Sequence, residues 1–237
     1  VLLFVFCGLT PLPCIATDDL ATAKEILEAT GVRGGLVVHL GCGDGELTAE
    51  LRVNERYVVH GLDSNPANVA TARRNLKAQG LYGPVSISTH AGSQLPYAEN
   101  LVQLLVVEEP DGVSMDEMMR VLSPRGVAYV RSDSGWIKTI KPWPAGMDEW
   151  THWLHGPDGN AVAHDQLVGP PRQMQWIANP LWSRHHNLMP SISAMVSSAG
   201  RVFYIVDEAP PAMTGGSPDK WAVVARNAFS GVELWRK

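Results

Sequence analysis

A turn with glycines at alternate positions constrains this chain more than any other feature. The stretch 37–63 reads as a buried strand, the turn Gly41–Gly45, a short helix, and a second strand that ends in Asp63. Glycine lets the backbone approach a ligand closely and take positive φ without a steric penalty. The following helix offers unpaired N–H groups and the positive end of its dipole. Because an α/β fold places a ribose-binding acid where Asp63 stands, this stretch predicts a site for an adenosine-like group.

The spacing of the glycines in this turn restricts the kind of ligand that the turn could bind. A dinucleotide site has the pattern G-x-G-x-x-G, whereas this turn is G-x-G-x-G with Glu46 at the position of the third glycine. An acid at that helix start would repel a pyrophosphate. A zwitterionic or cationic ligand is therefore favoured.

Four ordered segments resemble class I S-adenosylmethionine (SAM) dependent methyltransferases. The glycine turn resembles their motif I, usually V-L-D-L-G-C-G-T-G, and 63–66 (D-S-N-P) resembles the D-x-S/N-P that follows their second strand. The segment 94–100 resembles their L-P-F-x-D/E-N loop, and 119–126 resembles their R-V-L-K-P-G-G turn. The resemblance implies SAM as cofactor, with Asp63 on the ribose hydroxyls and the turn under the methionine portion. The implied cofactor-binding residues are Gly41, Cys42, Gly43, Asp44, Gly45, Asp63 and Ser64.

Three positions depart from the family pattern. His39 stands where motif I usually has an acid, Ala91 where an acid usually binds the adenine amine, and Gln103 where an aspartate usually precedes the fourth strand. The sequence assigns no catalytic residue. The candidates for a base are the acids near the end of that strand, for which a solvated loop is the alternative interpretation: Glu108, Glu109 and Asp111. His39, His60 and His90 are interpreted as hydrogen-bonded core histidines without a functional role.

Strands and helices alternate through the first half of the chain. Asn65 and Ser114 are helix N-caps, with Pro66 at the first helical position and Glu117 completing a capping box. This rhythm predicts an α/β fold with a doubly wound, Rossmann-like parallel sheet over 18–135, without closing antiparallel strands. The expected strands cover 36–40, 85–89, 101–107 and 126–130.

The N-terminal run 1–16 has the apolar character of a signal peptide, with cleavage expected after Ala16. This predicts an exported protein, whereas a buried N-terminal strand and a cytoplasmic protein are the alternative. After cleavage only Cys42 of the three cysteines would remain, so no disulfide is expected.

The net charge of −5 and the absence of a basic stripe argue against nucleic acid as a partner. No membrane association is expected after cleavage.

Tryptophan and histidine become frequent from residue 136, which predicts a junction over 136–190. The spacing of its histidines fits no metal-site template, so no metal is expected and structural packing is the favoured interpretation. These histidines are His152, His155, His164, His185 and His186.

The C-terminal segment 191–237 predicts strands, with a tight turn at Ser230-Gly231 between two of them. Residues 221–236 resemble the repeat of pyrroloquinoline quinone (PQQ)-like β-propellers, typically L-x-A-L-D-A-x-T-G-x-x-L-W. One repeat cannot close a propeller, so this incomplete all-β propeller segment implies further blades beyond the chain.

The sequence supports three functional hypotheses. The first is SAM-dependent methyl transfer to an unknown small-molecule or protein acceptor. The second is a non-catalytic exported binding or scaffold protein that retains a degenerate methyltransferase fold, and export would favour it because SAM is made in the cytosol. The third, a quinoprotein-type oxidoreductase, rests on fold analogy.

Overall fold

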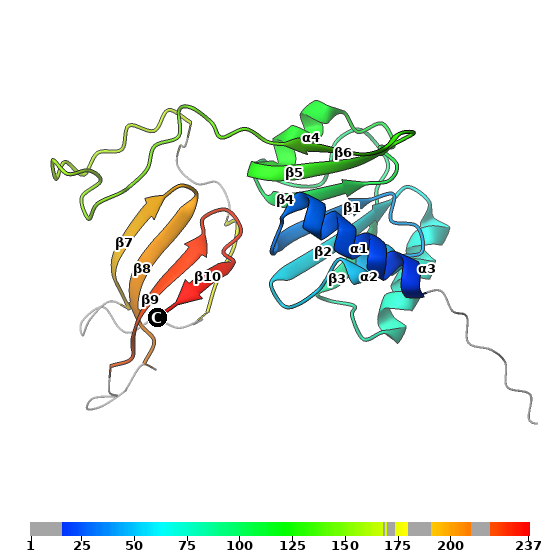
Figure 1. Cartoon of the computed structure of the whole chain (residues 1–237), viewed down its shortest axis with the longest axis horizontal. Coiled ribbons are helices and arrows are strands. Elements are labelled where there is room, and N and C mark those ends of the chain that lie inside the picture. Colours follow the sequence, from blue (N-terminus) through cyan, green and yellow to red (C-terminus); the bar gives the residue numbers. More distant parts are fainter. Residues whose placement is uncertain (1–15, 168, 170–173, 180–190, 210–218) are drawn as a thin grey trace, which may run out of the picture.

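A computed structural model describes residues 16–167, 169, 174–179, 191–209 and 219–237 as two sheets of different kinds (Figure 1). Of the expected signal segment, the described residues include only Ala16, the first residue of the first helix. Within these described ranges, no helix is both long and apolar enough to cross a membrane.

The first sheet has six strands in the order β3-β2-β1-β4-β5-β6. Its first five strands are parallel, which confirms the predicted Rossmann-like parallel sheet. The strands are β1 (Gly35–Leu40), β2 (Tyr57–Asp63), β3 (Val85–Thr89), β4 (Val102–Val107), β5 (Leu122–Ser132) and β6 (Gly135–Ile140). The helices are α1 (Ala16–Thr30), α2 (Glu46–Glu50), α3 (Pro66–Ala78) and α4 (Met115–Val121).

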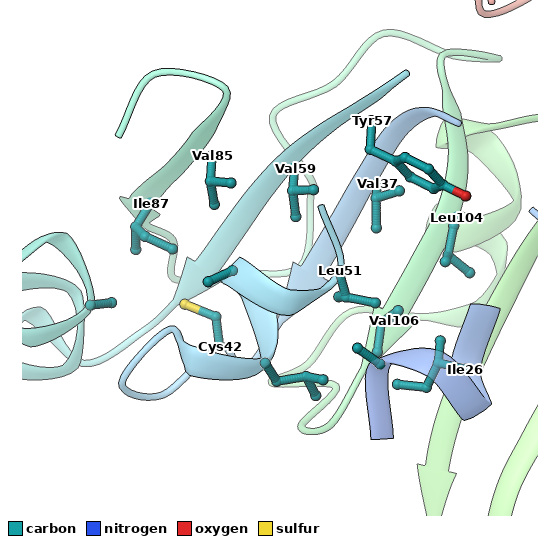
Figure 2. Packing of buried hydrophobic residues seen from close by; sticks show 14 of the residues in the cluster. Ile26, Val37, Cys42, Leu51, Tyr57, Val59, Val85, Ile87, Leu104 and Val106 are labelled. Atoms are coloured by element: carbon teal, nitrogen blue, oxygen red, sulfur yellow. The ribbon is translucent and has the colours of Figure 1, made fainter. Parts of the chain in front are cut away.

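Hydrophobic clusters cover both faces of this sheet. One contains side chains of α1, α2 and α3, and Figure 2 shows part of it, including Ile26, Cys42 and Val106. The other contains Met118 and Val121 of α4. Because both faces are covered, every residue of β4 is buried, which explains its continuous apolar run.

The predicted helix caps are confirmed, one of them only in part. Asn65 accepts a hydrogen bond from the backbone of Ala67 at the start of α3. Ser114 accepts one from the backbone N–H of Glu117 at 3.2 Å. The Glu117 carboxylate does not reach back to complete the capping box, because it binds the backbone N–H of Leu95 and the guanidinium of Arg120.

The expectation that the sheet lacks a closing antiparallel strand is wrong. The strand β6 pairs antiparallel with β5 from Gly135 to Ile140, so the sheet continues past the boundary expected at residue 135. Trp136 stacks on Tyr129 with ring centroids 4.9 Å apart and planes 8° apart. The high tryptophan content that suggested a junction therefore includes a side chain that packs within the sheet.

The second sheet is antiparallel, with its four strands in consecutive order from β7 to β10. These strands are β7 (Ile192–Ser198), β8 (Arg201–Asp207), β9 (Trp221–Asn227) and β10 (Glu233–Arg236). The predicted strand–turn–strand over 221–236 is confirmed, with Gly231 at φ +68° in the turn.

The second sheet lies against the amino-terminal ends of the parallel strands. A cleft of about 940 Å³ is lined by the first residues of β1, by Val58 of β2, by Gln103 of β4 and by the β9–β10 hairpin. A side chain added at Gly34 would stand 3.2 Å from a methyl group of Val232. The two sheets therefore meet at the edge opposite to the carboxyl ends of the strands.

We expect Trp136→Ala to lower the free energy of unfolding by about 1–3 kcal/mol, because it removes the stacked ring from the closing strand. Trp153→Ala is the matched control, since that side chain is 62% exposed. Urea unfolding monitored by circular dichroism measures both changes. Equal effects of the two substitutions would contradict the packing of β6 against β5 at the edge of the sheet.

Candidate functional site

The glycine turn between β1 and α2 contains three residues with positive φ: Gly41 at +80°, Gly43 at +54° and Gly45 at +83°. A Cβ atom at Gly41 would stand 2.9 Å from the backbone nitrogen of Glu109, and one at Gly45 would stand 2.8 Å from the Cβ of Ala72. At Gly43 no atom would lie within 4 Å. Gly41 and Gly45 therefore allow neighbouring segments to pack closely against the turn, whereas an added Cβ at Gly43 would face open space.

The carboxylate of Asp63 joins the end of β2 to this turn. It accepts hydrogen bonds from the backbone N–H of Gly43 at 2.9 Å and of Asn65 at 2.8 Å. The side-chain amide of Asn68 donates to both carboxylate oxygens, at 3.1 and 3.3 Å. A carboxylate has about four acceptor positions, so these contacts engage all of them. A ligand hydroxyl would have to displace Asn68 to bind Asp63.

Cys42 lies in the turn, but its side chain is part of the hydrophobic core. Burial, and next the negative charge of Asp63, raise the pKa of the Cys42 thiol to about 12, with smaller contributions from Asp44 and Glu108. The thiol is therefore protonated at neutral pH and unsuited to nucleophilic chemistry. The backbone of Cys42 is also engaged, since its N–H donates to Leu62 and its carbonyl accepts from Gly45.

The remaining predicted residues, Asp44 and Ser64, are exposed near the same turn. The Asp44 carboxylate accepts a hydrogen bond from the backbone N–H of Glu46 at 3.2 Å, and its carbonyl accepts one from the Asn75 side chain. These contacts fix the start of α2 and leave the Asp44 side chain exposed.

His39 is fully buried in β1, between two polar side chains of other elements. Its Nδ1 lies 2.8 Å from the hydroxyl of Thr48, and its Nε2 lies 3.5 Å from the carboxylate of Glu108. Glu108 also accepts a hydrogen bond from Arg131 at 2.8 Å. Hydrogen bonding to His39, followed by the contact with Arg131, holds the pKa of Glu108 below its usual value. The interpretation of His39 as a hydrogen-bonded core residue is confirmed.

The two other departures from the family pattern lie in different places. The Gln103 side chain accepts from the backbone N–H of Leu36 and donates to the carbonyl of Leu101, at the amino-terminal edge of the sheet. The glutamine that stands here in place of the usual aspartate therefore lies at the opposite edge of the sheet from the glycine turn. Ala91 is exposed just after β3, where His90 donates to the carbonyl of Asp63.

Sequence reasoning missed three polar residues of this edge: Asn68, Thr48 and Arg131. Asn68 stands three residues after the cap Asn65, in the first turn of α3, and this position was the available signal for its contact with Asp63. Thr48 and Arg131 reach the site through contacts between elements, for which the sequence offers no local pattern.

Two of the junction histidines, His152 and His155, lie outside the helices and named strands. His152 and His155 form an isolated antiparallel bridge, and His155 has φ +72°. His155 contacts Asp148 at 2.7 Å, and hydrogen bonds from His164 and then from His155 hold the pKa of Asp148 at about 2. No group of three or more potential ligands in the described part of the chain is arranged to hold a metal ion. His185 and His186 lie outside the described residues.

The segment that carries this site has a recognisable family pattern. Residues 37–126 match the model of the methyltransferase domain family. The match begins in β1 and ends in β5, so it includes the glycine turn, Asp63 and Glu108, and it covers less than half of the chain. The comparison with curated proteins found no match.

Solved structures show a partial likeness to the same part of the chain. A SAM-dependent methyltransferase from Aquifex aeolicus is 21% identical, with a TM-score of 0.42 over 47% of this chain and 64% of that chain. Geranyl diphosphate C-methyltransferase from Streptomyces coelicolor is 18% identical, with a TM-score of 0.42 over 46% of this chain and 44% of that chain. The chain thus spans only about half to two thirds of their length, and at these TM-scores nothing about function follows from the likeness.

We expect Cys42 to react very slowly with iodoacetamide at pH 8, because its thiol is buried and its pKa is raised to about 12. The measurement is mass spectrometry on a chain in which Cys7 and Cys14 are replaced by serine. The same chain in denaturing urea is the control and should react rapidly. A native rate equal to the unfolded rate would show that the thiol is accessible.

Proposed function

We propose that the first domain binds SAM at the carboxyl edge of its parallel sheet and transfers its methyl group to an acceptor. The observation that carries this proposal is the open face of Gly43, whose backbone N–H is bonded to the Asp63 carboxylate. An open glycine beside an acid at the end of the second strand suits a nucleoside whose ribose hydroxyls reach that acid. The match of 37–126 to the methyltransferase domain family supports SAM as that nucleoside.

The charge of the site favours a cationic ligand over a phosphorylated one. Asp63, Asp44 and Glu108 all raise the pKa of the neighbouring Cys42 thiol, so their negative potential acts at the turn itself. A pyrophosphate would be repelled by these groups, whereas the sulfonium of SAM would be attracted.

The proposed reaction is a direct displacement. A lone pair of the acceptor attacks the methyl carbon, and the carbon–sulfur bond breaks with its electron pair moving to sulfur. The neutral thioether S-adenosylhomocysteine leaves, and a proton lost by the acceptor passes to a base. Alignment supplies most of the catalysis. The lowered pKa of Glu108 makes it a weak base, while Glu109 and Asp111 are exposed carboxylates at the same edge.

The second candidate function is that of a non-catalytic exported binding or scaffold protein, whose first domain keeps a degenerate methyltransferase fold. The contact of Asn68 with Asp63 favours it, because a carboxylate whose acceptor positions are engaged binds a ribose less readily. Export of the chain, proposed from its N-terminal sequence, would favour it too.

The second sheet is proposed to be one blade of a PQQ-like propeller. Four consecutive antiparallel strands are what such a blade requires, and β7 to β10 provide them. This blade would serve as a binding platform or, in a quinoprotein, as part of an oxidoreductase.

We expect Gly43→Asn to weaken SAM binding by about tenfold or more, because a side chain there would fill the space that the ligand needs. The matched control is Gly80→Asn. Gly80 also has positive φ, at +70°, and open space around its added Cβ, but it lies at the end of α3. Calorimetric titration with SAM measures both variants. Absence of binding by the unmodified protein at millimolar SAM would refute the proposed function.

We expect Asn68→Ala to strengthen SAM binding by several-fold, because it frees acceptor positions of Asp63 for the ribose hydroxyls. Arg74→Gln, on the same helix and at an exposed side chain bonded to the hydroxyl of Thr71, is the control and should leave the affinity unchanged. Calorimetric titration measures both. Unchanged affinity in Asn68→Ala would contradict the assignment of Asp63 to the ribose.

A further inference from the structure

A carboxylate and a guanidinium lie together at the carboxyl edge of the sheet. Glu108 is the first residue after β4, and Arg131 is the penultimate residue of β5. The Arg131 Nη1 donates to the Glu108 Oε1 at 2.8 Å, while the Glu108 Oε2 lies 3.5 Å from the buried Nε2 of His39. The carboxylate of Glu108 thus lies between the guanidinium of Arg131, which donates to it, and the ring of His39.

Both members retain capacity for a ligand. The carboxylate of Glu108 has about four acceptor positions, of which these contacts engage two. The guanidinium of Arg131 has five N–H donors, and only one makes a hydrogen bond to another described residue. The side chain of Glu108 is 26% exposed and that of Arg131 is 61% exposed, so both are accessible from solvent.

The pair lies close to the glycine turn. The backbone N–H of Glu108 donates to the carbonyl of Leu40 at 3.0 Å. A Cβ atom at Gly41 would stand 2.9 Å from the backbone nitrogen of the next residue, Glu109. Glu108 also contributes to the raised pKa of the Cys42 thiol, so its negative charge acts on a side chain of the turn.

The strand order places this pair and Asp63 on opposite sides of β1. Asp63 ends β2 on one side, while β4 and β5 follow on the other. Neighbouring strands are about 4.8 Å apart, so roughly 10 to 14 Å separate β2 from β4 and β5. A ligand whose ribose reaches Asp63 and whose chain crosses the turn would place its far end beside Glu108 and Arg131.

We infer that Glu108 and Arg131 form the subsite for the α-amino acid end of this ligand, with the ammonium on Glu108 and the carboxylate on Arg131. This inference rests on the proposed function and specifies which part of the ligand these residues recognise. A zwitterion matches an ion pair charge for charge, and Arg binds carboxylates through paired N–H donors. Motif I of the methyltransferases usually has an acid at the position of His39 in β1. In this chain Glu108, which follows the neighbouring strand β4, would take the place of that acid. His39 is a positioning residue that orients the Glu108 carboxylate.

The test compares two neutral thioethers that differ only at the end in question. S-adenosylhomocysteine, the thioether left when SAM loses its methyl group, carries the zwitterionic end, whereas 5′-methylthioadenosine keeps the adenosine and lacks the amino acid chain. In calorimetric titrations of the full chain, Glu108→Gln should weaken the binding of S-adenosylhomocysteine by about tenfold and leave the affinity for methylthioadenosine within about twofold. Arg131→Gln should show the same selectivity. Asp133→Asn removes an equal charge from the exposed turn that follows β5 and should affect neither ligand.

Each outcome separates this inference from the proposed function. If the unmodified protein binds both ligands and Glu108→Gln weakens both equally or neither, the amino acid subsite is refuted while the proposed function stands. If the unmodified protein binds neither ligand, the proposed function fails and the subsite fails with it. Thermal unfolding of each variant shows whether a loss of binding comes from a loss of folding, and Arg131→Gln, at an exposed side chain, provides the independent reading if Glu108→Gln unfolds.

Discussion

The hydrogen bond between the Asp63 carboxylate and the backbone N–H of Gly43 is the contact on which the candidate site depends. It joins the end of β2 to the turn that follows β1, and the same carboxylate binds the start of α3. Since Gly45 packs against Ala72 of that helix, the turn is held between a strand and a helix. The shape of the turn is thus fixed by the protein itself, without a ligand.

This arrangement gives Asp63 two roles that compete. As a structural group it satisfies the N–H groups of the turn and of the helix start, and Asn68 completes its coordination. As a ligand-binding group it would need some of these acceptor positions. At the proposed nucleoside site, the availability of Asp63 to a ligand thus depends on the side-chain amide of Asn68.

Local sequence signals predicted most of the first domain, because its elements are specified locally. Asn65 and Pro66 mark the start of α3, and the apolar run at 101–107 corresponds to β4, since a strand covered on both faces must be apolar throughout. The strand β6 was missed because most of its residues are exposed and its tryptophan resembles the Trp-rich segment that follows. Only half of the predicted capping box forms at Ser114, because the Glu117 carboxylate binds the backbone N–H of Leu95, which precedes the helix, and the guanidinium of Arg120.

The site was less predictable than the fold. The sequence identified the glycines and Asp63 from their spacing, but it assigned no role to His39 and grouped Glu108 with loop acids. The contact between these two depends on the pairing of β1 with β4, whose residues are far apart in the sequence. Thr48 and Arg131 join them from α2 and β5, so the polar chain across this edge exists only in the folded sheet.

The placement of the second sheet has a consequence for the size of an acceptor. The β9–β10 hairpin lies at the amino-terminal ends of the parallel strands, whereas Gly43 and Glu108 lie at the carboxyl ends. The hairpin and the turn thus face different directions, and the hairpin does not overhang the site. If the proposed methyl transfer takes place at this edge, the hairpin would set no limit on the size of the acceptor.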